Sequence, residues 1–223
     1  MEIEAKFCVA DASVFAELRA LSSLGSYVLT PGEIQELADT YLDTPARRLC
    51  QAGYACRMRR WRDKLILTLK GVHADHTAQT LGIHRREEFE VELVGANAPA
   101  PAACVSAWPQ SAVRRKALDL VGREALTPWF TLTQVRHARL LLEGSRRVAE
   151  FCLDEVRIEG DPSGQLFLGL EIELVADGDE SDLDAIMGEL GRWQGLSPQT
   201  ESKFELALAV LGEVDHTYER YKQ

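Results

Sequence analysis

Charged and apolar residues alternate along several short segments of this chain, and this period of two limits its possible folds more than any other feature. Residues 2–7 read Glu-Ile-Glu-Ala-Lys-Phe, and residues 88–93 read Glu-Phe-Glu-Val-Glu-Leu. Successive side chains of a β-strand point to opposite faces, so each such strand has one charged and one apolar face. The pattern predicts an antiparallel sheet whose apolar face packs against helices.

Turn residues divide the chain into strands and helices of ordinary length. Strands are predicted at 1–9, 34–43, 54–62, 64–71, 84–94, 129–142, 147–159 and 165–176. Helices are predicted at 12–24, 110–122, from 181 or 182 to 193, and from 201 to 214 or beyond. A polar loop over 72–82 and an Ala/Pro-rich connection over 95–109 join them. Eight antiparallel strands are enough to close a barrel with room for a small ligand. We therefore expect an α+β fold, an eight-stranded closed antiparallel β-barrel with helices packed outside.

The charged faces of these strands carry almost only Arg, Lys and Glu. An ordinary sheet with one solvated face would also alternate, but it would mix in Thr, Ser and Gln. Charges that face a barrel interior are costly unless they are paired, so carboxylate pairs favour divalent cations and arginine pairs favour phosphate. The residues on these faces are Glu2, Glu4, Lys6, Arg57, Arg59, Lys70, Arg86, Glu88, Glu90, Glu171 and Glu173.

Composition excludes several other classes of protein. The net charge of −10 over 223 residues argues against general nucleic-acid binding. Five scattered cysteines without a CxxC pair predict neither a disulfide framework nor a zinc knuckle. The N-terminus is charged from its second residue and no apolar run approaches a membrane span, so we expect a cytoplasmic protein with no membrane partner. Neither a P-loop nor a dinucleotide-binding glycine motif is present.

The charged segments, taken in order, resemble the CYTH family of triphosphate tunnel metalloenzymes, in particular its bacterial inorganic triphosphatases and the subgroup fused to a CHAD domain. The resemblance covers residues 1–212 and leaves 213–223 as a tail or the start of a linker. The segments that carry it are Glu2-Ile-Glu-Ala-Lys6, Tyr41-Leu-Asp-Thr-Pro45, Arg57-Met-Arg59, Thr68-Leu-Lys70, Arg86-Glu-Glu-Phe-Glu90, Arg136, Asp154, Glu171-Ile-Glu173 and Ser202-Lys203-Phe204.

The resemblance implies a role for each of these charged residues. Phosphate oxygens would be bound by Lys6, Arg57, Arg59, Lys70, Arg86, Arg136 and Lys203. Mg²⁺ or Mn²⁺ would be held by Glu2, Glu4, Asp154, Glu171 and Glu173, since an all-oxygen ligand set favours these ions over zinc. Glu4, Lys70 and Lys203 are expected to be catalytic, and Glu88 and Glu90 to orient water or the arginines. Whether Arg139 acts together with Arg136 stays open.

The function expected from these residues is metal-dependent hydrolysis of inorganic triphosphate, or of a short polyphosphate, to pyrophosphate and phosphate. A class IV adenylate cyclase and a thiamine triphosphatase would use the same tunnel. An alternative of another class is a non-catalytic polyphosphate-binding module that works with a fused or associated CHAD domain. The retained carboxylates argue against this last alternative, because they would weaken pure anion binding.

Overall fold

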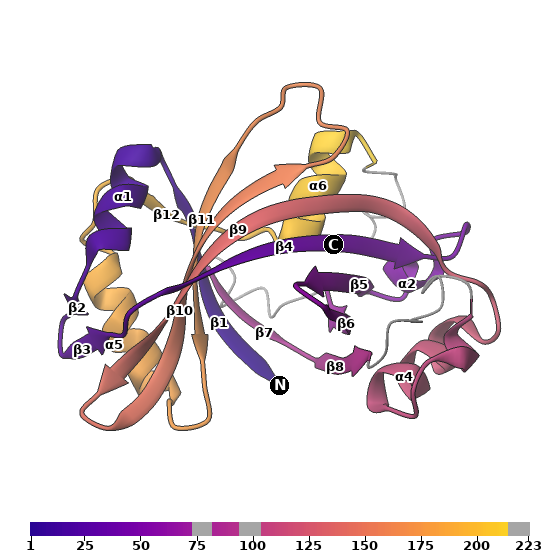
Figure 1. The fold of residues 1–223 in the computed structure, drawn as a ribbon, viewed down its shortest axis with the longest axis horizontal. Coiled ribbons are helices and arrows are strands. Elements are labelled where there is room, and N and C mark those ends of the chain that lie inside the picture. The colour runs from indigo at the N-terminus through magenta and orange to yellow at the C-terminus, as the bar shows by residue number, and fades with distance from the viewer. Residues whose placement is uncertain (73–81, 94–103, 214–223) are drawn as a thin grey trace.

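The computed structural model of the protein describes residues 1–72, 82–93 and 104–213, and its centre is an antiparallel β-barrel (Figure 1). The predicted polar loop, the Ala/Pro-rich connection and the tail lie largely outside these residues. The barrel strands are β1 (Glu2–Val9), β4 (Glu33–Asp43), β5 (Tyr54–Trp61), β6 (Lys64–Gly71), β7 (Ile83–Arg86), β8 (Glu88–Leu93), β9 (Thr127–Glu143), β10 (Arg146–Ile158) and β11 (Phe167–Leu174).

The strand order nearly closes the barrel. Neighbouring strands run β1-β11-β10-β9-β4-β5-β6-β8, and β7 pairs with the edge of β1 opposite β11. Strands β7 and β8 are separated by the single residue Glu87, so together they span the remaining gap. The predicted barrel is confirmed, but the predicted strand at 84–94 is two strands. It is interrupted because its first half pairs with β1 and its second half with β6.

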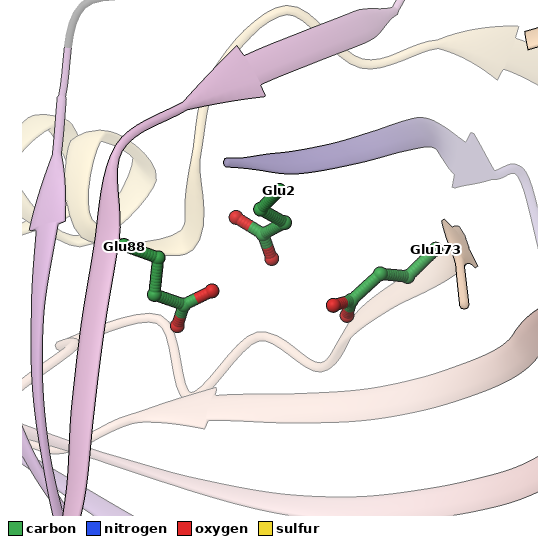
Figure 2. A group of neighbouring side chains, drawn as sticks. All are labelled: Glu2, Glu88 and Glu173. Atoms are coloured by element: carbon green, nitrogen blue, oxygen red, sulfur yellow. The ribbon is translucent and has the colours of Figure 1, made fainter. Parts of the chain in front are cut away.

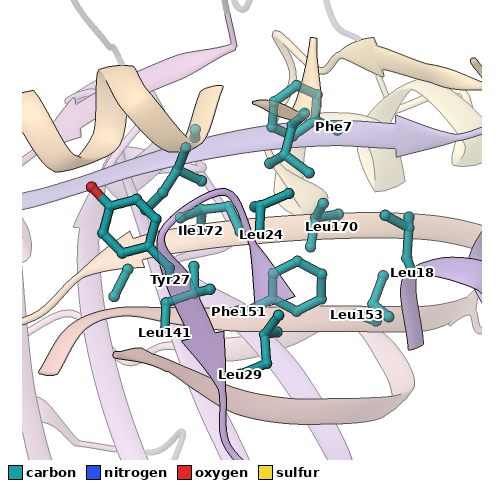
Figure 3. Packing of buried hydrophobic residues seen from close by; sticks show 14 of the residues in the cluster. Phe7, Leu18, Leu24, Tyr27, Leu29, Leu141, Phe151, Leu153, Leu170 and Ile172 are labelled. Atoms are coloured by element: carbon teal, nitrogen blue, oxygen red, sulfur yellow. The ribbon is translucent and has the colours of Figure 1, made fainter. Parts of the chain in front are cut away.

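Helices cover the apolar outer face of the barrel in two groups (Figure 1). Helices α1 (Ala12–Ala20) and α5 (Glu180–Leu190) lie together on one side of the barrel. Their apolar side chains form a core with the backs of β1, β10 and β11, which includes Leu18, Phe151, Leu170 and Ile172 (Figure 3). On the other side, α2 (Arg48–Gln51), η1 (Val105–Ala107) and α4 (Ala112–Val121) cover β5, β6 and β8. The described residues contain no helix that is both long and apolar enough to cross a membrane.

The last helix, α6 (Lys203–Leu211), brings part of the site to the barrel. It follows the short strand β12 (Leu196–Pro198), which pairs with β1. A capping box begins the helix: the Ser202 side chain accepts from the backbone N–H of Glu205, and the Glu205 side chain accepts from the backbone N–H of Ser202. Gly212 ends the helix in the left-handed conformation. Phe204 packs against Tyr41 and Phe130, which places the neighbouring Lys203 at the cavity wall.

The first predicted helix is too long. Helix α1 ends at Ala20 and is followed by a hairpin of β2 (Ser23–Leu24) and β3 (Tyr27–Leu29), which turns at Gly25 with φ of 57°. Strand β3 pairs with the end of β9, and its inner residues join the core. Two- and three-residue strands carry too few alternations to be told apart from a fraying helix by periodicity.

Candidate functional site

The barrel holds a cavity of about 600 Å³ whose wall is mostly charged. All but one of the charged site residues expected from the sequence line it, and the exception, Asp154, is buried behind its partners. The lining residues among them are Glu2, Glu4, Lys6, Arg57, Arg59, Lys70, Arg86, Glu88, Glu90, Arg136, Glu171, Glu173 and Lys203. The charged face of the sheet therefore points inward.

Three glutamates from three strands converge in this cavity and form an acidic triad. Glu2 comes from β1, Glu88 from β8 and Glu173 from β11, and Figure 2 shows their carboxylates turned toward one another. One oxygen of each lies within 4.8 Å of the others. In the described part of the chain, no lysine or arginine lies within ion-pair distance of Glu88 or Glu173. This oxygen-only donor set fits a hard divalent cation such as Mg²⁺ or Mn²⁺.

The proton affinity of the triad reflects its crowded negative charge. Burial, together with the charges of Glu2 and Glu4, raises the pKa of Glu173 to about 8. Burial and the neighbouring Glu4 also raise the pKa of Glu2, although Lys70 donates a hydrogen bond of 2.6 Å to it. A bound divalent cation would offset this repulsion, which supports the triad as a cation site.

The Glu173→Gln variant is expected to melt at a higher temperature than the wild type in metal-free buffer at about pH 9. The folded protein keeps the Glu173 proton until about pH 8, whereas the unfolded chain loses it near the ordinary glutamate value. The free energy of unfolding therefore falls as pH rises between these values. Glutamine removes this loss, a gain of roughly 2–5 kcal/mol or about 5–15 °C, measured by thermal denaturation.

The matched control for that measurement is Glu92→Gln, since Glu92 is exposed on β8 and pairs with Lys64 at 3.0 Å. Its melting temperature should stay close to that of the wild type at every pH. At pH 5 the Glu173→Gln variant and the wild type should have similar melting temperatures. A Glu173→Gln variant that gains nothing at pH 9 would show that the acidic triad is not crowded in solution.

Glu4 lies next to the triad but is surrounded by cations. Its carboxylate lies 3.1 Å from Lys6, 3.5 Å from Lys70 and 3.4 Å from Arg86. Burial alone would raise its pKa, but Lys6 and Lys70 outweigh burial and hold it at about 2. Glu4 therefore stays ionised, and its geometry suits the orientation of these cations at least as well as the binding of a metal.

A second ion-pair network surrounds Arg136. Arg136 donates to both carboxylate oxygens of Asp154, at 2.8 and 2.7 Å, and also to Glu171. Lys203 donates to the same two acids at 2.7 and 2.8 Å, and Lys6 donates to Glu171 at 2.6 Å. Despite burial, these cations lower the pKa of Asp154 and of Glu171. The structure thus brings two of the expected metal ligands into direct contact with expected phosphate-binding groups.

A third network contains a residue that the sequence analysis did not single out. Asp39 on β4 accepts hydrogen bonds from Nε and Nη2 of Arg59, both at 2.8 Å, and from Gln134 at 3.2 Å. Arg57 lies 3.7 Å from the same carboxylate and donates to Thr68 at 3.2 Å. The signal was present in the sequence, because Asp39 shares the inward period-two face of β4 with Tyr41.

Several further cavity residues were not singled out as site residues from the sequence, among them Tyr41 and Glu150. Tyr41 lines the cavity with its ring stacked on Phe130, and Glu150 lines it from β10. Arg139 does not reach the cavity. Its guanidinium donates to the backbone carbonyls of Leu21 and Thr30, at 2.5 and 2.7 Å, so it links the end of α1 to the residue that follows β3.

Comparisons with solved structures agree with this fold. HpAC1 from Hippeastrum, assigned as an adenylyl cyclase and reported with a dominant triphosphatase activity, is 21% identical over 97% of this chain and 99% of its own, with a TM-score of 0.71. A protein of Bacillus halodurans assigned as an adenylate cyclase (bh2851) is 19% identical over 92% and 96%, with a TM-score of 0.63. PH1819 from Pyrococcus horikoshii is 22% identical over 94% and 99%, with a TM-score of 0.55.

At these identities the solved structures show a shared fold and nothing finer. A comparison with curated proteins finds no match. The family model of the CYTH domain matches residues 1–205, which include every charged residue of the cavity described above. This match confirms the resemblance seen in the sequence, and the chain therefore belongs to the CYTH domain family.

Proposed function

We propose that this protein hydrolyses inorganic triphosphate, or a short polyphosphate, to pyrophosphate and phosphate with the help of Mg²⁺ or Mn²⁺. The observation that carries the proposal is that one cavity has both a basic part and an acidic part. Basic groups of Arg57, Arg59, Arg136 and Lys203 line the same space as the acidic triad. A linear chain of phosphates with its counterion matches both halves of that space.

The basic residues would bind and orient the phosphates. Arginine offers forked donors and lysine a compact charge, and both form strong hydrogen bonds with phosphate oxygens. Arg57 and Arg86 keep buried guanidinium nitrogens without a hydrogen-bond partner among the described residues. These donors are directed by neighbouring contacts before any ligand binds, which lowers the entropic cost of binding.

Hydrolysis of a phosphoanhydride depends mostly on positioning and on stabilising charge in the transition state. Lys70 and Lys203 are the proposed catalytic cations, and Glu4 would hold Lys70 and Lys6 in place. Glu90 would orient water or the arginines. The divalent cation, held by Glu2, Glu88 and Glu173 with Glu4 and Glu171 nearby, would neutralise phosphate charge and lower the pKa of a bound water.

The comparisons support this proposal at the level of the family. HpAC1, which has the same fold, is described by a dominant triphosphatase activity even though it was assigned as a cyclase. One specific feature favours a second candidate, an adenylate cyclase acting on ATP. The apolar side chains of Leu37, Trp61 and Ile66 also line the cavity and would give an organic group a surface to pack against.

A substrate panel tests the proposal. Inorganic triphosphate, longer polyphosphate, ATP and thiamine triphosphate are each incubated with Mg²⁺ or Mn²⁺, and phosphate, pyrophosphate and cyclic AMP are measured. We expect inorganic triphosphate to have the highest kcat/KM and to give equal amounts of phosphate and pyrophosphate. Cyclic AMP as the main product from ATP would favour the cyclase instead, and tight binding without turnover would favour a polyphosphate-binding module.

A further inference from the structure

Asp39 is the one charged member of the Arg57–Arg59 network that does not reach the cavity wall. It lies on the inward face of β4, yet its side chain is completely buried and is absent from the cavity lining. An ionised carboxylate at this depth is costly unless its partners compensate it. Asp39 therefore lies behind the cavity wall and would act through the residues that it contacts rather than by touching a substrate.

The partners of Asp39 come from two neighbouring strands. Arg59 on β5 makes a forked contact with both carboxylate oxygens at 2.8 Å, and Gln134 on β9 donates to Oδ2 at 3.2 Å. Arg57 completes the group from 3.7 Å. Burial alone would raise the pKa of Asp39, but Arg59 and Arg57 lower it to about 2. The carboxylate is therefore ionised across the whole working pH range.

These contacts give the two arginines fixed and different orientations. Arg59 uses one N–H of Nε and one of Nη2 on Asp39, so the second N–H of Nη2 and both N–H groups of Nη1 stay available on the other edges of the guanidinium. Arg57 uses Nη2 on Thr68, and its Nε is buried without a hydrogen-bond partner in the part of the chain that the structure describes. A planar guanidinium binds phosphate well only in a suitable orientation, so the group that sets that orientation controls the geometry of binding.

We propose that Asp39 is a positioning residue that fixes the guanidinium groups of Arg57 and Arg59 for the phosphates of the substrate. The inference rests on the proposed function, which supplies the reaction. The orientation of the two arginines is taken from the contacts described above. Removing the negative charge leaves the cavity more positive, so substrate anions still bind. The arginines, however, are no longer held where charge develops in the transition state, and only such differential contacts accelerate the reaction.

The kinetic test uses Asp39→Asn with inorganic triphosphate and Mg²⁺ or Mn²⁺. We expect kcat to fall at least tenfold while KM is unchanged or lower. The control is Asp182→Asn, because Asp182 is another buried carboxylate, paired with Arg146 at 2.7 Å and with Tyr27 at 3.1 Å away from the cavity. It should lose stability but keep both kinetic constants per folded molecule. An unchanged kcat, or a higher KM at unchanged kcat, overturns the proposal.

A second variant covers the case in which Asp39→Asn does not fold. Gln134→Leu removes one hydrogen bond to the carboxylate and keeps the Arg59 pair. It should also lower kcat, but by a smaller factor than Asp39→Asn does. A Gln134→Leu enzyme that folds but turns over like the wild type contradicts the role of the network.

A binding measurement separates this inference from the proposed function. The affinities of triphosphate and of sulfate are measured by calorimetry in EDTA, where no turnover is expected. Sulfate is small enough to bind either guanidinium in many orientations, so it gains fully from the more positive cavity. Triphosphate gains less, because its several phosphates contact both arginines together. Asp39→Asn should therefore lower the ratio of triphosphate to sulfate affinity several-fold. An unchanged ratio overturns the role of Asp39, whereas a wild type that binds triphosphate but does not hydrolyse it after Mg²⁺ or Mn²⁺ is added overturns only the proposed function.

Discussion

Hydrolysis of inorganic triphosphate is expected to fall to background when EDTA removes divalent cations, and to return when Mg²⁺ or Mn²⁺ is added. The acidic triad places three carboxylates close together, and the raised pKa of Glu173, about 8, agrees with this crowding. Without a cation this charge repels the phosphates as well. Ca²⁺ should inhibit rather than replace the active ion, because it prefers longer bonds and more ligands. Phosphate release measured over a series of cation concentrations checks this.

The variant that isolates the triad is Glu88→Gln. The sequence analysis gave Glu88 a water-orienting role, but the structure places it beside Glu2 and Glu173. Changing a proposed direct ligand should raise the Mg²⁺ concentration for half-maximal activity by roughly tenfold or more, since changes in outer contacts of metal sites already cost 10–100-fold. Glu92→Gln, four residues further along the same strand face, is the control. Full activity of the wild type in excess EDTA would contradict the metal-dependent mechanism.

The sequence predicts the barrel and its charged interior well because both depend on local period-two patterns. The barrel strands were located, with β7 and β8 predicted as one, and alternation assigned the shared charged faces of β1, β5 and β11, which line the cavity. The hairpin of β2 and β3 was missed, because its pairing with β9 is a long-range contact that no local pattern reports.

The partners of each charge could not be predicted in the same way. Alternation shows that Glu4, Glu171 and Glu173 face inward, but it does not show which of them meets a cation. In the structure Glu171 contacts Arg136 and Lys203, whereas Glu173 has no such neighbour among the described residues. The difference arises from the stagger between strands, which a single sequence does not reveal. Asp39 was overlooked for the same reason, since its importance comes from Arg59 on the neighbouring strand.

The same pairing predicts that two similar mutations will differ in their effect on stability. Arg57→Ala and Arg59→Ala should each lower kcat/KM by about 10–100-fold, because each removes charge-assisted contacts of roughly 1.5–3 kcal/mol with phosphate. Arg59→Ala also leaves Asp39 buried without its forked partner, so it should lower the free energy of unfolding by about 3–5 kcal/mol. Arg57 lies farther from Asp39, and its loss should cost only about 1–2 kcal/mol.

Chemical denaturation and steady-state kinetics on the same preparations measure both effects. Arg192→Ala is the control, since Arg192 is 75% exposed and its pair with Glu189 is on the surface; it should change neither quantity. A double variant, Arg59→Ala with Asp39→Ala, should recover part of the stability lost in Arg59→Ala, because it removes the uncompensated carboxylate, but it should not recover activity. If Arg57→Ala and Arg59→Ala are equally destabilising, Asp39 does not form its forked pair with Arg59 in solution, and the fixed orientation of the arginines has no physical basis.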